Sequence, residues 1–208
     1  MNRFLKAKHW QLFLLFFGVP FIFQVLMMGS IFSQIGNDTS EPLLFIFNFL
    51  SIMPILMILM MGVLFGWFWS VVIGLQKYLP EGVTIKMTRF KVFFFIPIIY
   101  ILFFTTSFSI MFFNISGIVE GASEPPFDPS LIFAYFGIIM PLHLFSMFCI
   151  FHTIYQAAKV FKAVELQREV KFSDFAGEFF MIWFFYVGIW IIQPKVNKMV
   201  AEEHGTNL

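Results

Sequence analysis

The stretch that decides the fold is residues 43–75, LLFIFNFLSIMPILMILMMGVLFGWFWSVVIGL, which contain no Asp, Glu, Lys or Arg. As one straight helix this stretch would be about 50 Å long, whereas the hydrocarbon core of a bilayer is about 30 Å thick. Trp67 and Trp69 indicate where the helix leaves the hydrocarbon, because tryptophan prefers the membrane interface. We therefore predict a span over residues 43–68, followed by an interfacial or cytoplasmic extension.

Four further apolar segments accompany this one. Of the 208 residues, 60% are hydrophobic and 12% are charged, against about a quarter charged in soluble proteins. We predict an all-α polytopic integral membrane protein with about five transmembrane helices in a single membrane domain, residues 1–208. The predicted spans are residues 10–32, 43–68, 92–115, 131–157 and 175–192. The last is the shortest, and if it enters the membrane only part way, the C-terminal tail stays in the cytoplasm.

Basic residues gather in three stretches between these segments. Eleven of the thirteen lysines and arginines lie there: Arg3, Lys6, Lys8, Lys77, Lys86, Arg89, Lys91, Lys159, Lys162, Arg168 and Lys171. The loops at residues 33–42 and 116–129 carry only acidic charges. Cytoplasmic loops of membrane proteins are enriched in Lys and Arg, so the charges predict a cytoplasmic N-terminus. They are too dispersed to form a nucleic-acid surface, and we expect no nucleic-acid partner.

Small residues recur at every fourth position of the second segment. They are Gly62, Gly66, Ser70 and Gly74. A stripe of this kind lets another helix approach closely, so we predict a helix-packing face. The pattern leaves open whether the partner helix belongs to the same chain or to another subunit.

A weak internal repeat relates the two halves of the chain. Residues 41–42 and 52–54 resemble residues 128–129 and 139–141 at one constant offset. A duplicated helical hairpin followed by a fifth helix would produce this pattern, and chance similarity between apolar segments is the alternative.

Few strongly polar residues fall inside the apolar segments, and these are the candidate functional residues. They are Gln24, Thr105, Thr106, His143, His152 and Glu178. His152 and Glu178 are expected near the cytoplasmic ends of their helices, where a contact between them is geometrically allowed. His143 is expected near the bilayer midplane, where a neutral imidazole needs a hydrogen-bond partner. Gln24 or the hydroxyl cluster at residues 105–109 could supply it.

Motifs for common chemistries are absent from the sequence. It contains no G-x-x-x-x-G-K phosphate loop, no G-x-S-x-G elbow and no H-E-x-x-H pair. His143 and His152 are nine residues apart, which places them on opposite faces of a helix and prevents them from sharing one metal or haem. We predict no catalytic residue, no cofactor and no metal site.

The C-terminal segment carries a family resemblance. Residues 172–180, FSDFAGEFF, followed by WFF at 183–185 and GIWIIQPKVN at 188–197, resemble the ending of uncharacterised small bacterial polytopic inner-membrane proteins of similar length. The resemblance implies a multi-pass protein of a bacterial inner membrane and no particular activity. It draws attention to Glu178 and Gln193.

These features favour a non-enzymatic integral membrane protein that acts as an accessory or assembly subunit of a membrane complex. We expect membrane lipid around it, and a protein partner or a second copy packed on the second helix. The alternative is a small transporter or channel with a path near His143 and residues 105–109. A third hypothesis is a membrane redox or lipid-modifying enzyme.

Overall fold

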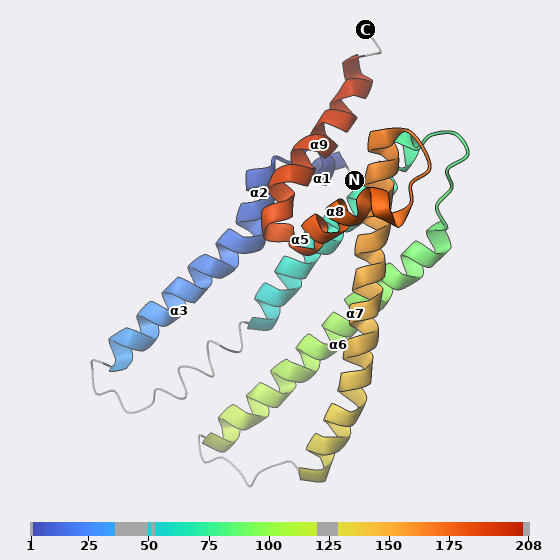
Figure 1. The fold of residues 1–208 in the computed structure, drawn as a ribbon. Helices are drawn as coiled ribbons and strands as arrows, with labels where there is room; N and C mark the ends of the chain where they lie inside the picture. Colours follow the sequence, from blue (N-terminus) through green and yellow to red (C-terminus); the bar gives the residue numbers. More distant parts are fainter. Residues whose placement is uncertain (1, 36–49, 51–52, 120–128, 206–208) are drawn as a thin grey trace.

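The computed structural model of the chain describes residues 2–35, 50, 53–119 and 129–205, and every regular element within them is a helix. The elements are α1 (Asn2–Lys6), α2 (His9–Phe13), the π-helical η1 (Leu14–Gly18), α3 (Val19–Ile35), α5 (Met53–Gly74), the 3-10 turn η2 (Gln76–Tyr78), α6 (Met87–Val119), α7 (Pro129–Leu166), α8 (Phe172–Trp183) and α9 (Phe185–Gly205). The long helices α3, α5, α6 and α7 run alongside one another, and the short helices gather at one end (Figure 1).

Four stretches within the described residues are long and apolar enough to cross a membrane. They are His9–Ser33, Met53–Tyr78, Met87–Ile110 and Phe136–Leu166. These stretches correspond to the first four predicted spans, and the all-α polytopic architecture is confirmed. Residues 43–49, at the start of the second predicted span, and most of the two acidic loops lie outside the described residues.

The first span contains a π-helical turn. In η1 the Val19 N–H donates to the carbonyl of Leu14, five residues earlier. Pro20 follows directly and has no N–H to donate, which breaks the regular ladder of helical hydrogen bonds. A single wider turn is a common response to such a break. The helix therefore continues from α2 through η1 into α3 without ending.

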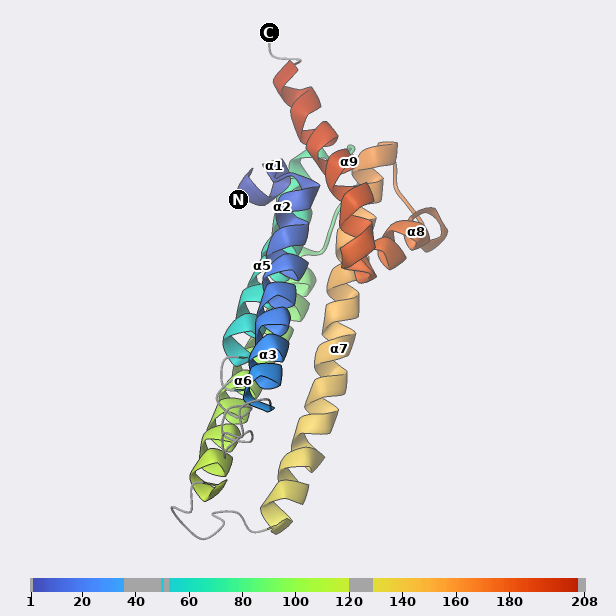
Figure 2. The ribbon, with the colours of Figure 1, turned by 90° about the vertical axis from the view of Figure 1, so that its left-hand side faces the viewer.

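The fifth predicted span, residues 175–192, is divided into two helices. α8 ends at Trp183, Phe184 leaves the helical conformation with φ −87° and ψ 59°, and α9 begins at Phe185. A Cβ at Gly188 would overlap the Met181 carbonyl, so the two helices meet at a position that only glycine allows. The segment therefore forms a bent helix pair rather than the continuous fifth span that the sequence predicts. α8 lies crosswise to α7, and α9 leads the C-terminus to the end where the N-terminus lies (Figure 2).

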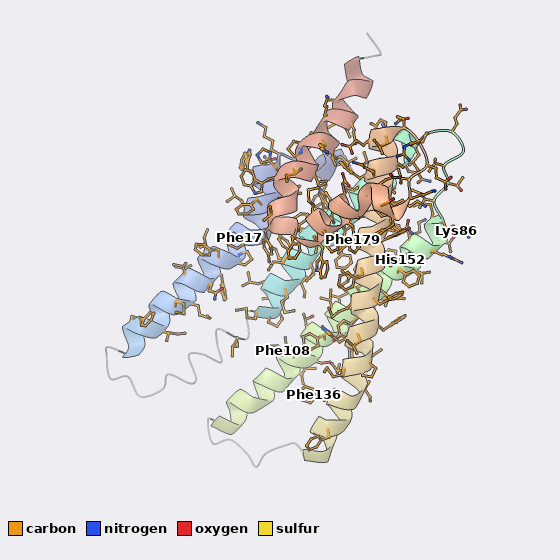
Figure 3. The ribbon with its side chains drawn as sticks, viewed as in Figure 1. Phe17, Lys86, Phe108, Phe136, His152 and Phe179 are labelled. Carbon is orange, nitrogen blue, oxygen red and sulfur yellow. The ribbon has the colours of Figure 1, made fainter. Side chains whose placement is uncertain are left out.

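The two ends of the helix bundle differ in packing. We call the end that contains α1, α8 and residues 77–91 and 159–171 the basic end, and the opposite end, where α6 ends and α7 begins, the distal end (Figure 1). The largest fully buried side chains lie toward the basic end: Trp67, Phe68, Phe90, Phe161 and Phe175. Phe108 and Phe136 lie far from it (Figure 3). Trp67 is 1% exposed and is thus enclosed by protein instead of facing a membrane interface.

Candidate functional site

Four charged side chains form an ion network at the basic end. Lys162 and Glu165 are one turn apart on α7, Glu178 comes from α8, and Lys195 comes from α9. Lys162 Nζ donates to Glu165 Oε2 and to Glu178 Oε1, both at 2.7 Å. Lys195 Nζ donates to Glu165 Oε1 at 2.7 Å. The alternating charges hold α8 and α9 against α7, and Lys162 balances the carboxylate of Glu178, which is only 6% exposed.

The amide of Gln193 joins three parts of the chain. Its Oε1 accepts a hydrogen bond from Trp67 Nε1 on α5 at 2.7 Å. Its Nε2 donates to the carbonyls of Phe4 and Ala7, at 2.9 and 2.8 Å. Gln193 is fully buried, and these bonds satisfy both ends of the amide. The side chain therefore fastens α1 and the link that follows it to α5 and α9, and we call this arrangement the Gln193 clasp.

A second ionic contact links the end of α7 to the start of α8. Arg168 Nη1 donates to Asp174 Oδ2 at 3.1 Å, and the Lys171 N–H donates to the same oxygen at 2.9 Å. The Arg168 guanidinium, followed by the Lys171 N–H, holds the pKa of Asp174 below its ordinary value. The carboxylate thus satisfies a backbone donor at the first turn of α8.

The structure does not bring His152 and Glu178 into contact. Glu178 binds Lys162, whereas the His152 ring packs against Phe93 with centroids 4.3 Å apart. His152 Nε2 also lies 3.4 Å from the amide nitrogen of Gln156, one turn along α7. The view in Figure 3 labels His152 on α7. His152 is packed against an aromatic side chain, and this arrangement does not support proton transfer between His152 and Glu178.

His143 finds its partner on α6. The Tyr100 hydroxyl lies 3.0 Å from His143 Nδ1, and the two rings meet edge to face. Both sequence candidates for this role lie elsewhere: Gln24 is an exposed residue of α3, and the threonines are bonded within α6. Thr105 and Thr106 donate to the carbonyls of Ile101 and Leu102 on their own helix, each at 2.8 Å.

His143 itself is exposed on the surface of the chain. Within the described residues its one hydrogen bond joins Nδ1 to Tyr100, and a neutral imidazole has one further hydrogen-bonding nitrogen, Nε2. In either tautomer Nε2 keeps the capacity to donate or to accept. A polar group therefore faces outward from a helix that is apolar enough to cross a membrane.

The small-residue stripe of α5 packs on α1 of the same chain. A Cβ at Gly66 would come within 2.9 Å of the Phe4 ring, and a Cβ at Gly74 would overlap the Leu5 side chain. Ser70 lies between these positions and donates to the Gly66 carbonyl at 2.8 Å. Gly62 has open space beside it. The partner of most of the stripe is thus a five-residue N-terminal helix and not a long transmembrane helix.

Beyond Phe4 the stripe opens into a groove between α5 and α6, with a volume of about 510 Å³. The α5 side of the groove includes Ile58, Gly62, Phe65 and Trp69, and the α6 side includes Phe94, Phe95, Ile98 and Leu102. Phe65 and Phe94 are buried, while Ile58 and Leu102 are 44% and 48% exposed. The groove therefore has a closed floor and rims that reach the surface. Its lining can accept an apolar occupant.

In the part of the chain that the structure describes, no three His, Cys, Asp or Glu side chains lie close enough together to bind one metal ion.

Comparison with known proteins identifies no family: no protein-family model, curated protein or solved structure matches the chain. Fold and site together define a polytopic helical membrane protein, with its polar contacts concentrated at the basic end and an apolar groove beside them.

Sequence reasoning missed several participants in these sites, among them Tyr100, Lys162 and Phe4. The spacing of Lys162 and Glu165, three residues apart in a helix, was a visible signal for half of the ion network. Tyr100 and Phe4 gave no signal beyond their apolar surroundings, because their partners come from other helices.

Proposed function

We propose that the protein is a non-enzymatic accessory or assembly subunit of a membrane complex, and that a transmembrane helix of a partner protein packs on the face that carries Tyr100 and His143. The observation behind this proposal is the polar pair itself. A hydrogen-bonding nitrogen that faces hydrocarbon is costly, and across helix interfaces in membranes such groups bond to neighbouring helices. A partner helix that bonded to His143 Nε2 would remove that cost.

The surroundings of His143 fit a helix better than isolated lipid chains. Phe136, Met140 and Met147 share one face of α7 with His143, at helical spacings of four and three residues. These three neighbours are 55%, 58% and 40% exposed. Methionine adapts its shape to irregular partners, so the face combines pliable apolar contacts with one polar anchor.

Site-specific photo-crosslinking in native membranes tests the proposal. A photoreactive phenylalanine analogue at Met140 or Met147 should give an adduct of one defined protein, identified by mass spectrometry. The matched control is Val25, which is 54% exposed on α3. His143→Leu should reduce the adduct by about threefold, because a hydrogen bond between helices in a membrane contributes about 0.6 kcal/mol on average.

Two outcomes would overturn this proposal. One is adduct formation at Val25 equal to that at Met140, which would mean unselective collision. The other is an adduct with a second copy of the chain alone, which would replace the hetero-complex with a homo-oligomer.

The transport alternative has less support from the same geometry. A path would need polar groups facing a shared interior, but Thr105 is 2% exposed with its hydroxyl bonded to its own helix. His143 lies on the outer face of the chain. We therefore retain the subunit as the proposed function.

A further inference from the structure

We infer that the groove between α5 and α6 binds one acyl chain of an anionic phospholipid from the leaflet at the basic end, with the headgroup held beside Lys91. The inference is independent of the partner proposed for His143, which lies on another face. It depends on the lining of the groove, on its length and on the charges at one end of it.

The lining is that of a lipid site. Apart from the Ser70 hydroxyl, the Trp69 indole N–H and the Met61 thioether, the side chains around the groove are hydrocarbon or glycine. The Ser70 hydroxyl is occupied, because it donates to the Gly66 carbonyl. The volume of about 510 Å³ lies inside the range of about 300–1,000 Å³ that is typical of small-ligand sites. An apolar chain would therefore meet an almost wholly apolar lining.

The length of the groove matches one leaflet. Along α5 the lining runs from Ile58 to Ser70, which is about 18 Å at 1.5 Å per residue. Half of a hydrocarbon core of about 30 Å is about 15 Å, the depth that an acyl chain of one leaflet reaches. Phe4 of α1 lies near the end of the groove toward the basic end, through its contact with Gly66.

The charges at that end are complementary to an anionic headgroup. Lys91 precedes Phe94 and Phe95 by three and four residues, so it lies on the groove face of α6 one turn closer to the basic end. Arg3 directly precedes Phe4, and both basic residues are exposed. Residues 1–9 and 77–91 together contain seven Lys and Arg residues and one acid, Glu81. Basic residues between helices at the membrane surface attract anionic lipid headgroups.

A transmembrane helix of another subunit is a poorer fit to the groove. α5 and α6 pack directly on each other beside it, through edge-to-face contact of Phe65 and Phe94. A helix with its side chains is about 10 Å across, too wide to enter between two helices in contact. An acyl chain has no such requirement.

Quenching of Trp69 fluorescence by brominated lipid tests the inference, since Trp69 lines the groove. The full chain is reconstituted in phosphatidylcholine vesicles that contain a low fraction of brominated phosphatidylglycerol. In matched vesicles the bromine is on phosphatidylcholine at the same fraction. The signal of Trp69 is the difference between the wild type and Trp69→Phe. We expect stronger quenching by the brominated anionic lipid.

Two variants and their controls locate the site. Gly62→Phe adds a ring at the groove from a Cβ position that meets open space, and should abolish the preference for the anionic lipid. Gly29→Phe, also in open space but on α3, should preserve it. Lys91→Gln should weaken the preference by about fivefold, the contribution of one basic residue at an anionic surface, whereas Lys86→Gln should change it less.

Equal quenching by the two brominated lipids in the wild type would overturn the inference. So would a preference that survives in Gly62→Phe when that variant elutes as a folded, monodisperse protein. If Gly62→Phe does not fold, Lys91→Gln decides, because that change leaves the groove intact. An unchanged preference in Lys91→Gln would exclude the proposed headgroup contact.

Discussion

One helix shows how differently the two ends of this molecule are stabilised. On α7, Phe161 at the basic end is fully buried, whereas Phe133 near the distal end is 79% exposed. Around Phe161 the chain provides its own packing, ion network and clasp. Around Phe133 the described residues provide little packing, and lipid can take that place because acyl chains are as apolar as the side chain. The free energy of folding is therefore concentrated at the basic end, and the distal helices are left available to lipid and partners.

Truncation of the two phenylalanines tests that difference most strongly. Phe161→Ala should lower the free energy of unfolding by about 3–5 kcal/mol, because it opens a cavity in a filled core. Phe133→Ala should change it by no more than about 0.5 kcal/mol. Reversible unfolding in mixed micelles measures both. Similar losses for the two variants would mean that stability is distributed evenly along α7.

The ion network should account for the next largest effect. Lys162→Met leaves the buried carboxylate of Glu178 without its cation, and because Lys162 is 17% exposed we expect a loss near the lower end of the range for such pairs, about 3 kcal/mol. The double variant Lys162→Met/Glu178→Leu removes the stranded charge. It should regain most of the loss in the same unfolding assay. A double variant as unstable as Lys162→Met would show that packing, and not charge compensation, sets the cost.

The junction of α8 and α9 should have a smaller but position-specific effect. Gly188→Ala places a Cβ on the Met181 carbonyl and should cost about 1–3 kcal/mol by overpacking. Gly177→Ala, with open space at its Cβ inside α8, should be neutral or stabilise by up to about 1 kcal/mol. Only Gly188→Ala should lower the thermal midpoint. A harmless Gly188→Ala would contradict the bent helix pair.

Lowering the pH should reduce the stability of the start of α8 and leave the stability of the distal end unchanged. Arg168 holds the pKa of Asp174 below its unfolded-state value, so the stabilisation is complete above about pH 4 and is lost as the pH falls through the folded-state pKa. Asp174→Asn should make stability less sensitive to pH in that acidic range. Hydrogen exchange at the first turn of α8 would report the change, with the exposed Glu169→Gln as the control.

The sequence was sufficient for the features that depend on composition. The charge-free run in residues 53–75 predicts a membrane helix because few other structures tolerate so much apolar surface. The three basic stretches also lie together at one end of the helices, as their alternation with the apolar segments predicts (Figure 1). Both results follow from counting residues along the chain.

Features that depend on contacts between helices could not be predicted. The break at Phe184 has no proline or glycine at the site itself, and the need for glycine at Gly188 is seen only from its close approach to Met181 in the folded pair. The stripe at Gly66 signals a close neighbour but does not reveal that this neighbour is the short helix α1. The pairing of His143 with Tyr100 depends on how α6 and α7 are shifted relative to each other, which neither segment encodes alone.

The Gln193 clasp can form only late in the synthesis of the protein. Its bonds join residues that are 126 to 189 positions apart in the chain. While the ribosome is still adding the first four spans, α1 has left it, but the amide that fastens α1 has not yet been made. A nascent chain arrested before residue 193 would leave the Trp67 indole N–H and two carbonyls of the N-terminal segment unsatisfied. Fastening of α1 thus waits for translation of α9, and the clasp distinguishes a chain that extends through α9 from one that stops before it.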